Sequence, residues 1–239
     1  MLETLLHGAK QLGLSLTSKQ TQQFQLYYQE LIEWNKRVNL TAITDYEEVQ
    51  LKHFLDSLTL VPAFEDKTWS KGHFFLLDVG TGAGLPGIPL KILLPKVRLV
   101  LLESVAKKTA FLQHMVNCLS LDHVEVLTGR AEDIAHQDSY RERFDLVVSR
   151  AVGRLSTIAE LTLPFCREGG LFIAPKKGKI EEELGQATKA IDTLGGKLKE
   201  VKKVELELLE PRFLVMVEKV SPTPQRYPRR AGVPAKHPL

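Results

Sequence analysis

The chain has 239 residues, of which 44% are hydrophobic and 26% charged, and its formal net charge is +3. This length can bury a full core, while the charge is too small to identify a partner by itself. The N-terminus lacks the basic and apolar regions of a secretory signal, and no apolar run approaches the ~18 residues of a membrane helix, so we expect a cytoplasmic protein without membrane association.

Residues 1–65 are predicted to form a helical N-terminal region. A short amphipathic segment precedes a long helix, which Thr17 and Gln20 open as a capping box. That helix places Tyr27 on its apolar face, at spacings of three and four residues from other apolar side chains. A further helix is expected over residues 46–61.

The segment LLDVGTGAGLPG, residues 76–87, is the most informative part of the chain. An apolar run ends at an acidic residue, Asp78, and a dense turn with Gly80, Gly82 and Gly84 follows. Glycines let a backbone turn tightly and approach a ligand that a Cβ atom would block. The pattern predicts the first βα unit of a nucleotide-binding sheet, with ligands at the carboxyl ends of its strands.

Two cofactors compete for this turn. Residues 82–87 fit the GxGxxG pattern of dinucleotide sites, but that pattern should start directly after the strand, where Gly80 opens GxGxG instead. The Asp78 carboxylate would repel a pyrophosphate, whereas it can meet the cationic methionine end of S-adenosylmethionine (SAM). The sequence therefore favours SAM.

A second acidic residue supports a nucleoside. An apolar strand is expected over residues 98–102 and ends in Glu103, about 20 residues past the glycines. A carboxylate at this place can accept hydrogen bonds from both ribose hydroxyls, in SAM and NAD sites alike. Ser104, which follows it, completes the cofactor-binding candidates of this turn.

The third strand, expected over residues 124–127, leads into the segment TGRAED. In methyltransferase-like sheets this loop lies beside the adenine. The backbone of Ala131 and the side chain of Glu132 or Asp133 are the candidate contacts, although Asp133 can equally open a helix.

Strands and helices alternate from residue 74 onward, which is typical of a parallel sheet. Expected strands are 74–79, 98–102, 124–128, 144–149 and 170–174, and expected helices are 87–94, 105–120, 154–166 and 179–195. The segments 197–208 and 212–220 can pair as an antiparallel hairpin around a turn at Glu210-Pro211. We therefore predict an α/β fold with a Rossmann-like SAM-dependent methyltransferase sheet over residues 66–220, since a dinucleotide-binding sheet normally stays parallel.

Residues 221–239 contain five prolines, and their four cations and lack of acidic residues leave the rest of the chain at about −1. So many prolines argue against a helix or a central strand. We expect an extended basic tail that does not pack on the body and that serves RNA affinity.

Cations follow the fourth and fifth strands. Arg150 comes directly after an apolar strand, and Lys176 begins the segment KKGK. A basic rim and a basic tail suit a phosphate-bearing substrate, although Lys177 and Lys179 also read as ordinary surface lysines. Arg150 and Lys176 are candidates for substrate positioning, and neither is assigned as catalytic.

The two cysteines, Cys118 and Cys166, have no CxxC spacing and no histidine partner motif. We therefore predict buried packing residues in a reduced protein, with no disulfide and no metal site.

The whole chain resembles the bacterial small-subunit ribosomal RNA guanine-N7 methyltransferases, the glucose-inhibited division protein B family. The segments that carry the resemblance are WNKRVNLTAI (34–43), KHFLDSL (52–58), DVGTGAGLPG (78–87), GRAED (129–133), VSRAV (148–152) and RYPRRAGVPAKHPL (226–239). The resemblance implies cofactor contacts at Gly80, Leu85, Ala131, Glu132 and Arg150. Pro175 stands where the family usually has leucine, which leaves the placement of Lys176 open.

The implied reaction is methyl transfer from SAM to N7 of a guanine in 16S ribosomal RNA, free or in the small ribosomal subunit. Guanine N7 carries a lone pair and no proton, so the reaction needs alignment rather than a general base. A methyltransferase for a small molecule or a protein is the first alternative, and a non-catalytic RNA-binding or division-associated protein is the second. We expect a monomer.

Overall fold

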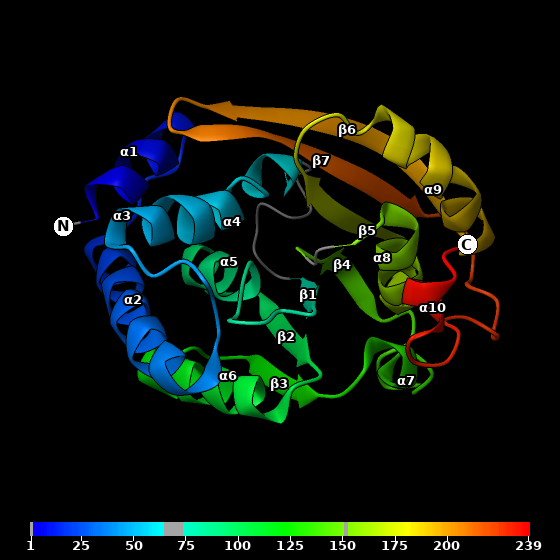
Figure 1. Cartoon of the computed structure of the whole chain (residues 1–239), viewed down its shortest axis with the longest axis horizontal. Helices are drawn as coiled ribbons and strands as arrows, with labels where there is room; N and C mark the ends of the chain where they lie inside the picture. The colour runs from blue at the N-terminus through cyan, green and yellow to red at the C-terminus, as the bar shows by residue number, and fades with distance from the viewer. Residues whose placement is uncertain (1, 65–73, 151–152) are drawn as a thin grey trace.

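A central sheet of seven strands, in the order β3-β2-β1-β4-β5-β7-β6, organises the molecule (Figure 1). The computed structural model describes residues 2–64, 74–150 and 153–239. Strands β1 to β5 pair in parallel, and β7 runs antiparallel to both β5 and β6. The predicted α/β fold, mostly parallel with an antiparallel C-terminal hairpin, is thereby confirmed.

The strands alternate their side chains between two cores. Their bounds are β1 Phe75–Val79, β2 Arg98–Glu103, β3 Val124–Thr128, β4 Phe144–Val148, β5 Cys166–Lys176, β6 Gly196–Leu206 and β7 Leu209–Lys219. Leu76 lies opposite Leu99 and Leu146 in the ladder, and all three belong to one buried cluster. The next residue, Leu77, belongs to the other cluster. Both faces of the parallel strands are therefore covered, as their continuous apolar sequences require.

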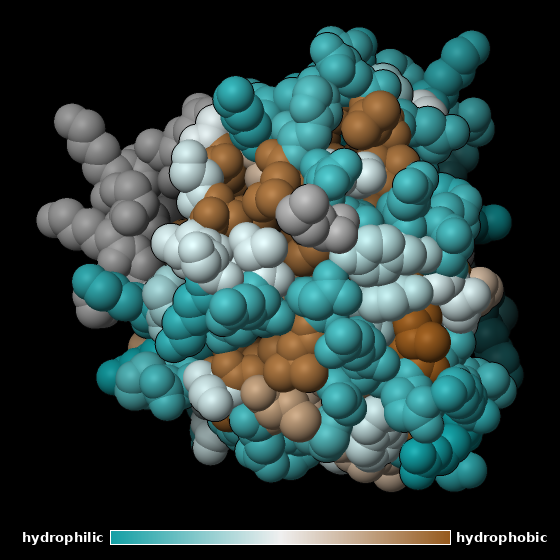
Figure 2. Space-filling model, turned by 90° about the vertical axis from the view of Figure 1, so that its left-hand side faces the viewer, coloured by the Kyte–Doolittle hydropathy of each residue, from teal (hydrophilic) through white to brown (hydrophobic). Residues whose placement is uncertain are grey.

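The first face is covered by the N-terminal helices together with α5 and α6 (Figure 1). Their bounds are α1 Glu3–Gln11, α2 Ser18–Val38, α3 Tyr46–Val49, α4 Asp56–Leu58, α5 Gly87–Leu93 and α6 Ala106–Cys118, with a π-helix at Gln50–Leu55 between α3 and α4 and a 3-10 turn at Val61–Phe64. Seen from the side of α1 and α2, the surface shows separate apolar patches between polar side chains (Figure 2). The main apolar stripes of these helices face inward and share one core with the sheet.

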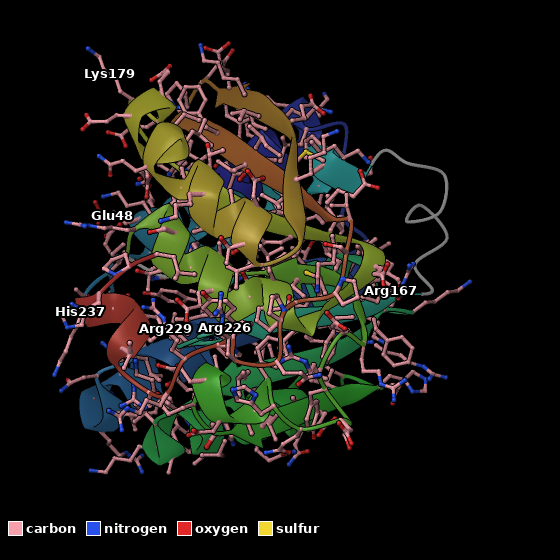
Figure 3. All side chains as sticks on the ribbon, turned by 90° about the vertical axis from the view of Figure 1, so that its right-hand side faces the viewer. Glu48, Arg167, Lys179, Arg226, Arg229 and His237 are labelled. Carbon is pink, nitrogen blue, oxygen red and sulfur yellow. The ribbon has the colours of Figure 1, made fainter. Side chains whose placement is uncertain are left out.

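The second face is covered by α7 Ala131–Ile134, α8 Leu155–Thr162 with the 3-10 turn Leu163–Phe165, and α9 Glu181–Thr193. The last helix, α10 Val233–Lys236, contacts α8. Figure 3 shows α10 and the C-terminal segment on this side of the molecule.

Local sequence signals place the N-terminal elements. The capping box that opens α2 is present, because Thr17 Oγ1 accepts from Gln20 N at 3.3 Å and Gln20 Oε1 accepts from Thr17 N at 2.8 Å. The helix predicted over 46–61 is also present, but its middle turn is a π-helix. The predicted boundary at residues 65 and 66 lies outside the described residues, so the division into 1–65, 66–220 and 221–239 stays a prediction.

Two strand predictions are wrong in detail. The hairpin turns at residues 207–208, so the Glu210-Pro211 pair lies inside β7 rather than in the turn. Pro211 is tolerated there because it lies at a register shift of the hairpin, between the Val204–Arg212 and Leu206–Leu209 pairs, and beyond Phe213, where the pairing with β5 ends. Strand β5 begins at Cys166, four residues before its expected start, because Cys166 already pairs with Phe144.

The prediction that residues 221–239 form an unpacked arm without helix is wrong. Tyr227 is buried, and Arg141 donates to the carbonyl oxygens of Tyr227 at 2.9 Å and Thr223 at 2.8 Å. Arg229 forms a two-pronged ion pair with the fully buried Glu160, at 2.9 and 2.6 Å. The tail therefore packs against the α7 and α8 side of the body, with its side chains Arg226 and Arg229 seen there in Figure 3. Its prolines limit long helices, but they do not prevent the single turn α10, which has a proline in its first turn.

The two cysteines differ from each other. Cys166 is buried, as predicted, and burial raises the pKa of its thiol to about 12. Cys118 is exposed, so its prediction as a buried residue is wrong. It lies in the last turn of α6, on the side of the helix that faces α2 rather than the sheet. None of the helices in the described ranges is both long and apolar enough to span a membrane.

Candidate functional site

The glycine turn after β1 leaves an open space on its outer side. Gly80 and Gly82 have φ angles of +68° and +60°, and a Cβ atom at either would meet nothing within 4 Å. The backbone conformation requires glycine there, while the emptiness around it leaves room for a ligand to approach the main chain. Gly84 differs, because a Cβ atom there would collide with Ile88 and Tyr27.

Asp78 lies directly beneath this turn and is fully buried. Its Oδ2 accepts from Thr81 Oγ1 at 2.6 Å and from Gly87 N at 2.8 Å, whereas Oδ1 has no hydrogen-bond partner among the described residues. Burial raises the pKa of this carboxyl from 3.8 to about 6, and the hydrogen bonds and the charge of Arg150 only partly oppose that rise. An incompletely satisfied buried acid favours a cationic ligand.

Glu103 holds the turn from the next strand. Its Oε2 accepts from Gly82 N at 3.0 Å and its Oε1 accepts from Val105 N at 2.9 Å and, weakly, from Ser104 Oγ at 3.4 Å. Among the described residues, Oε2 accepts only the bond from Gly82 N and keeps a second lone pair, so the side chain can still accept from a ligand hydroxyl.

A third contact on the glycine turn comes from the N-terminal helices. Tyr27 of α2 is fully buried, and its hydroxyl donates to Ala83 O at 2.5 Å. Burial raises the pKa of Tyr27 far above its ordinary value. The sequence pattern places Tyr27 on an apolar face and does not indicate this role, because a tyrosine hydroxyl gives no periodic signal.

A cleft runs along the carboxyl ends of β1 to β4. Among the predicted residues, Gly80, Ser104, Ala131 and Glu132 line it. The other lining residues are mainly apolar or backbone: Val79, Leu102, Gly129, Arg130, Ser149, Ile158 and Leu161. The predicted Asp78, Gly82, Gly84, Leu85 and Glu103 form or support the glycine turn behind this surface. The cleft is thus a mostly apolar pocket with a few polar groups, the usual form of a small-molecule or cofactor site.

Glu132 has a second partner that the sequence did not suggest. Its Oε1 accepts from the backbone N–H of Gly232 at 3.0 Å. The C-terminal tail therefore reaches the end of the cleft where the adenine was expected.

A second pocket lies beside the cleft and is strongly basic. Asp56, Arg150, Gly153, Pro175, Lys176, Lys177, Glu183 and Arg212 line it. Ser149 faces the cleft while the next residue, Arg150, faces this pocket, so the two cavities share a wall. We call it the basic pocket.

Asp56 organises the basic pocket. Its Oδ2 accepts from Arg150 Nη1 at 2.9 Å, and its Oδ1 accepts from Arg212 Nε. Arg212 is almost completely buried, and it also donates to Glu210 O at 2.6 Å. Two guanidinium groups on one carboxylate leave a net positive charge that points into the pocket.

Lys176 is held on the opposite side. Its Nζ donates to Gly153 O and to Glu183 Oε1, both at 2.8 Å. Glu183 Oε1 also accepts from Leu155 N at 2.8 Å, which fixes the start of α8 to the same carboxylate. Pro175, the departure from the family pattern, pairs with Leu214 across the ladder and leaves Lys176 in the pocket wall.

The segments WNKRVNLTAI and KHFLDSL meet next to Arg150. Thr41 Oγ1 donates to His53 Nε2 at 2.7 Å, and His53 Nδ1 donates to Lys52 O at 3.1 Å. Arg150 Nη1 also donates to Lys52 O, at 3.1 Å. Burial, together with the charge of Arg150, lowers the pKa of His53 to about 4, so its imidazole is neutral at physiological pH.

The structure thus brings the predicted residues into two adjoining cavities. Asp56 and Arg212 were missed, and they lie 156 positions apart in the chain. The only local signal for Arg212 is a lone arginine ahead of the apolar run FLVMV. Ala151 and Val152 of the segment VSRAV lie outside the described residues.

Comparison of the sequence with known proteins identifies one family throughout. The sequence model of the family described as rRNA small subunit methyltransferase G matches residues 20–211. A protein of Dehalococcoides mccartyi strain CBDB1, called ribosomal RNA small subunit methyltransferase G, is 54% identical over 239 residues that cover 100% of both chains. A protein of the same name from Roseiflexus sp. strain RS-1 is 47% identical over 238 residues, again with full coverage of both.

Among solved structures, TrmN from Thermus thermophilus superposes with a TM-score of 0.52 at 16% identity, over 70% of this chain and 48% of that one. TYW2 of M. jannaschii, solved in complex with AdoMet, superposes with a TM-score of 0.50 at 17% identity, over 63% and 74% of the two chains. At such low identity these likenesses concern the fold alone.

Proposed function

We propose that this chain, which belongs to the rRNA small subunit methyltransferase G family, transfers the methyl group of SAM to N7 of a guanine in 16S ribosomal RNA. Ser149 and Arg150 support this most directly. Ser149 faces the cleft, behind which Asp78 lies, and Arg150 faces the basic pocket. A methyl donor bound in the cleft would therefore lie next to a phosphate-bearing acceptor bound in the pocket.

The residues of the cleft fit SAM. The bound cofactor supplies an electrophilic methyl group on a positively charged sulfur. The unsatisfied Oδ1 of Asp78 suits the cationic methionine end, and the open space at Gly80 and Gly82 admits it to the main chain. Glu103 Oε2 has a lone pair left for the ribose, and Ala131 and Glu132 flank the end of the cleft assigned to the adenine.

The basic pocket suits the RNA. Arg150 presents a partly exposed guanidinium group that Asp56 holds in place, the buried Arg212 adds positive charge behind it, and Lys176 lines the same pocket. Such donors match guanine O6 or the phosphates on either side of it. They must leave N7 itself free, because that lone pair forms the new bond.

No side chain has to remove a proton. Neutral guanine carries no proton on N7. His53, the histidine next to the basic pocket, stays uncharged from pH 7 to 9 because its pKa lies at about 4. The contribution of the protein is the alignment of acceptor and donor, together with the electrostatic field of the two arginines. At saturating SAM we therefore expect a methyl-transfer rate without a steep ionisation of an enzyme side chain from pH 7 to 9.

The test is a labelled methyl transfer from SAM to purified 16S RNA and, separately, to small ribosomal subunits. We expect incorporation at a guanine that becomes sensitive to chain cleavage by the chemistry specific for N7-methylguanosine. Labelling of a small molecule or a protein, with none in RNA, would contradict the proposal. SAM binding without any methyl transfer would instead support the non-catalytic alternative.

Ribosomal RNA as the substrate implies that the protein works where ribosomes are made, in the cytoplasm. The docked tail still offers exposed cations at Arg226, Arg230 and Lys236 for RNA, while Arg229 is engaged with Glu160. The monomeric state stays a prediction, and size determination in solution tests it.

A further inference from the structure

We propose that Glu30, His114 and Cys118 form a binding site for a zinc-class metal ion between α2 and α6. Glu30 Oε2 lies 2.6 Å and Cys118 Sγ lies 3.3 Å from the same atom, His114 Nε2. All three potential ligand atoms lie within 4.8 Å of one another. Within the described ranges no other three histidine, cysteine or acidic side chains converge in this way.

The local sequence explains how the three groups meet. His114 and Cys118 are four residues apart on α6, and residues at this spacing lie one above the other on a helix surface. Glu30 comes from α2, which packs along α6 (Figure 1). Trp34, one turn further on α2, stacks on the imidazole with ring centroids 5.0 Å apart and thereby limits its rotation. The segment HMVNC is a histidine–cysteine pair at ligand spacing, so the prediction that Cys118 has no histidine partner is wrong.

Without a metal, His114 can satisfy its two neighbours only in part. If Nε2 donates its hydrogen to Glu30, the Cys118 thiol is left with Nδ1, which lies 3.8 Å from Sγ and offers only a long S–H···N contact. A cation placed among the three atoms would give each lone pair its own partner.

The distances are close to those that zinc requires. Metal–nitrogen and metal–oxygen bonds of about 2.0–2.1 Å and a metal–sulfur bond of about 2.3 Å place tetrahedral nitrogen and sulfur ligands roughly 3.6 Å apart. The observed separation of Nε2 and Sγ is 3.3 Å, and because Sγ also lies only 3.8 Å from Nδ1, a rotation of the Cys118 side chain has to bring the sulfur in front of Nε2. Glu30 has to move further, since its oxygen now lies at hydrogen-bond distance, but it is a partly exposed side chain with rotamer freedom.

The ligand types select the metal. Thiolate and imidazole favour Zn²⁺ and related ions over Mg²⁺ and Ca²⁺, and three protein ligands leave a fourth position for water. On binding, the Cys118 thiol releases its proton to solvent and the sulfur coordinates as thiolate. All three groups are accessible from solvent, and none of them lines the cleft or the basic pocket.

A metal here would join α2 of the N-terminal helical region to α6, the helix that follows β2. Glu30 lies one turn after Tyr27, whose hydroxyl binds Ala83 in the glycine turn. The bridge between α2 and α6 would therefore stabilise the helix that supports this turn. We expect it to raise the melting temperature rather than to take part in methyl transfer.

The test titrates untagged, reduced full-length protein with Co²⁺ and then with Zn²⁺. We expect a sulfur-to-cobalt charge-transfer band and the visible bands of tetrahedral Co²⁺, saturating at one ion per chain and abolished by Zn²⁺. Cys118→Ser should remove the charge-transfer band. His114→Gln and Glu30→Gln should each weaken binding by at least about 10–100-fold, the loss that even outer-shell substitutions cause.

Matched controls are available in the same chain. His7→Gln removes another exposed histidine, and Cys166→Ser removes the other thiol, and both should leave the bands unchanged. Zn²⁺ should raise the melting temperature of the parent but not that of Cys118→Ser. The proposal fails if no charge-transfer band forms, if the band survives Cys118→Ser, or if Cys166→Ser removes it.

Discussion

Two buried aspartates, one behind each cavity, are in opposite electrostatic situations. Asp78 behind the cofactor cleft has 0% exposure, one oxygen without a partner among the described residues, and a pKa raised to about 6. Asp56 in the basic pocket is also nearly buried, but Arg150 and Arg212 bind both of its oxygens. The first acid still needs a cation, whereas the second is already neutralised and leaves surplus positive charge.

The difference shows how the two cavities divide the work. An acid with an unsatisfied oxygen prepares the cleft for a cationic ligand, and an acid shared by two guanidinium groups prepares the pocket for an anionic one. The cleft is built largely from backbone and short-range contacts. The basic pocket is built from side chains that come from distant parts of the chain.

The largest expected effect is at the glycine turn. Gly82→Val puts a branched side chain at φ +60°, where an L-residue costs about 1–2 kcal/mol, and fills the space left for the ligand. We expect no saturable SAM binding in calorimetry while circular dichroism shows a retained fold. Gly13→Val is the matched control, because Gly13 has φ +73° and equally open surroundings far from the cleft. If both variants bind SAM as the parent does, the glycine turn does not hold the cofactor.

The second prediction concerns Asp56, the aspartate of the basic pocket. Asp56→Asn removes the charge that holds Arg150 and Arg212, and we expect methyl transfer to RNA to fall by about 100-fold, or ~2.7 kcal/mol in transition-state stabilisation. SAM affinity should change much less. Asp145→Asn is the control, since it weakens another Asp–Arg pair, with Arg167, at the amino end of β4 and thus at the opposite end of the parallel strands. A uniform loss of SAM affinity and activity in Asp56→Asn would mean that the two cavities are not separate.

The different construction of the two cavities also explains which site residues could be predicted from the sequence. The glycine turn, Asp78 and Glu103 lie within about 25 residues, and each follows a strand whose end the sequence marks, so a local pattern locates them. Asp56 and Arg212 meet only through the tertiary fold. Asp56 lies in α4, directly after the π-helix, and Arg212 lies in the antiparallel strand β7. No periodicity couples such positions, and therefore only Arg150 and Lys176, which follow predicted strands, were found.

The prediction that residues 221–239 do not pack on the body failed for a different physical reason. Its composition predicts poor regular structure, which is correct, but composition does not report on specific docking. Buried partners on the body, Glu160 and Arg141, receive Arg229 and the tail carbonyls. Those partners are spread over residues that carry no pattern of their own.

The third prediction concerns this docking, which touches the cleft and not the basic pocket. Arg229→Gln leaves the fully buried Glu160 without its ion pair, and we expect the free energy of unfolding to fall by about 2–3 kcal/mol. Because Gly232 donates to Glu132, SAM affinity should weaken as well. Urea unfolding and calorimetry measure the two effects. Arg230→Gln, an exposed neighbour, should change neither, and equal behaviour of the two variants would show that the ion pair does not anchor the tail.

The smallest expected effect is a pH dependence that originates at Asp78. Its pKa is raised from 3.8 to about 6, chiefly by burial, with Glu103 adding to the rise and Arg150 opposing it. The folded protein therefore binds this proton more tightly than the unfolded chain, so the free energy of unfolding decreases as the pH rises from about 4 to about 6. A cation binds the ionised carboxylate better, so SAM should bind roughly tenfold more weakly at pH 5 than at pH 7, one unit on the acid side of that pKa. Asp78→Asn, which cannot ionise, should show weaker binding that varies little over the same range in calorimetry. If the SAM affinity of the parent and of Asp78→Asn varies with pH in the same way, another group controls the titration. The proposed contrast between Asp78, which has an oxygen without a partner among the described residues, and Asp56, which is paired with two arginines, would then be wrong.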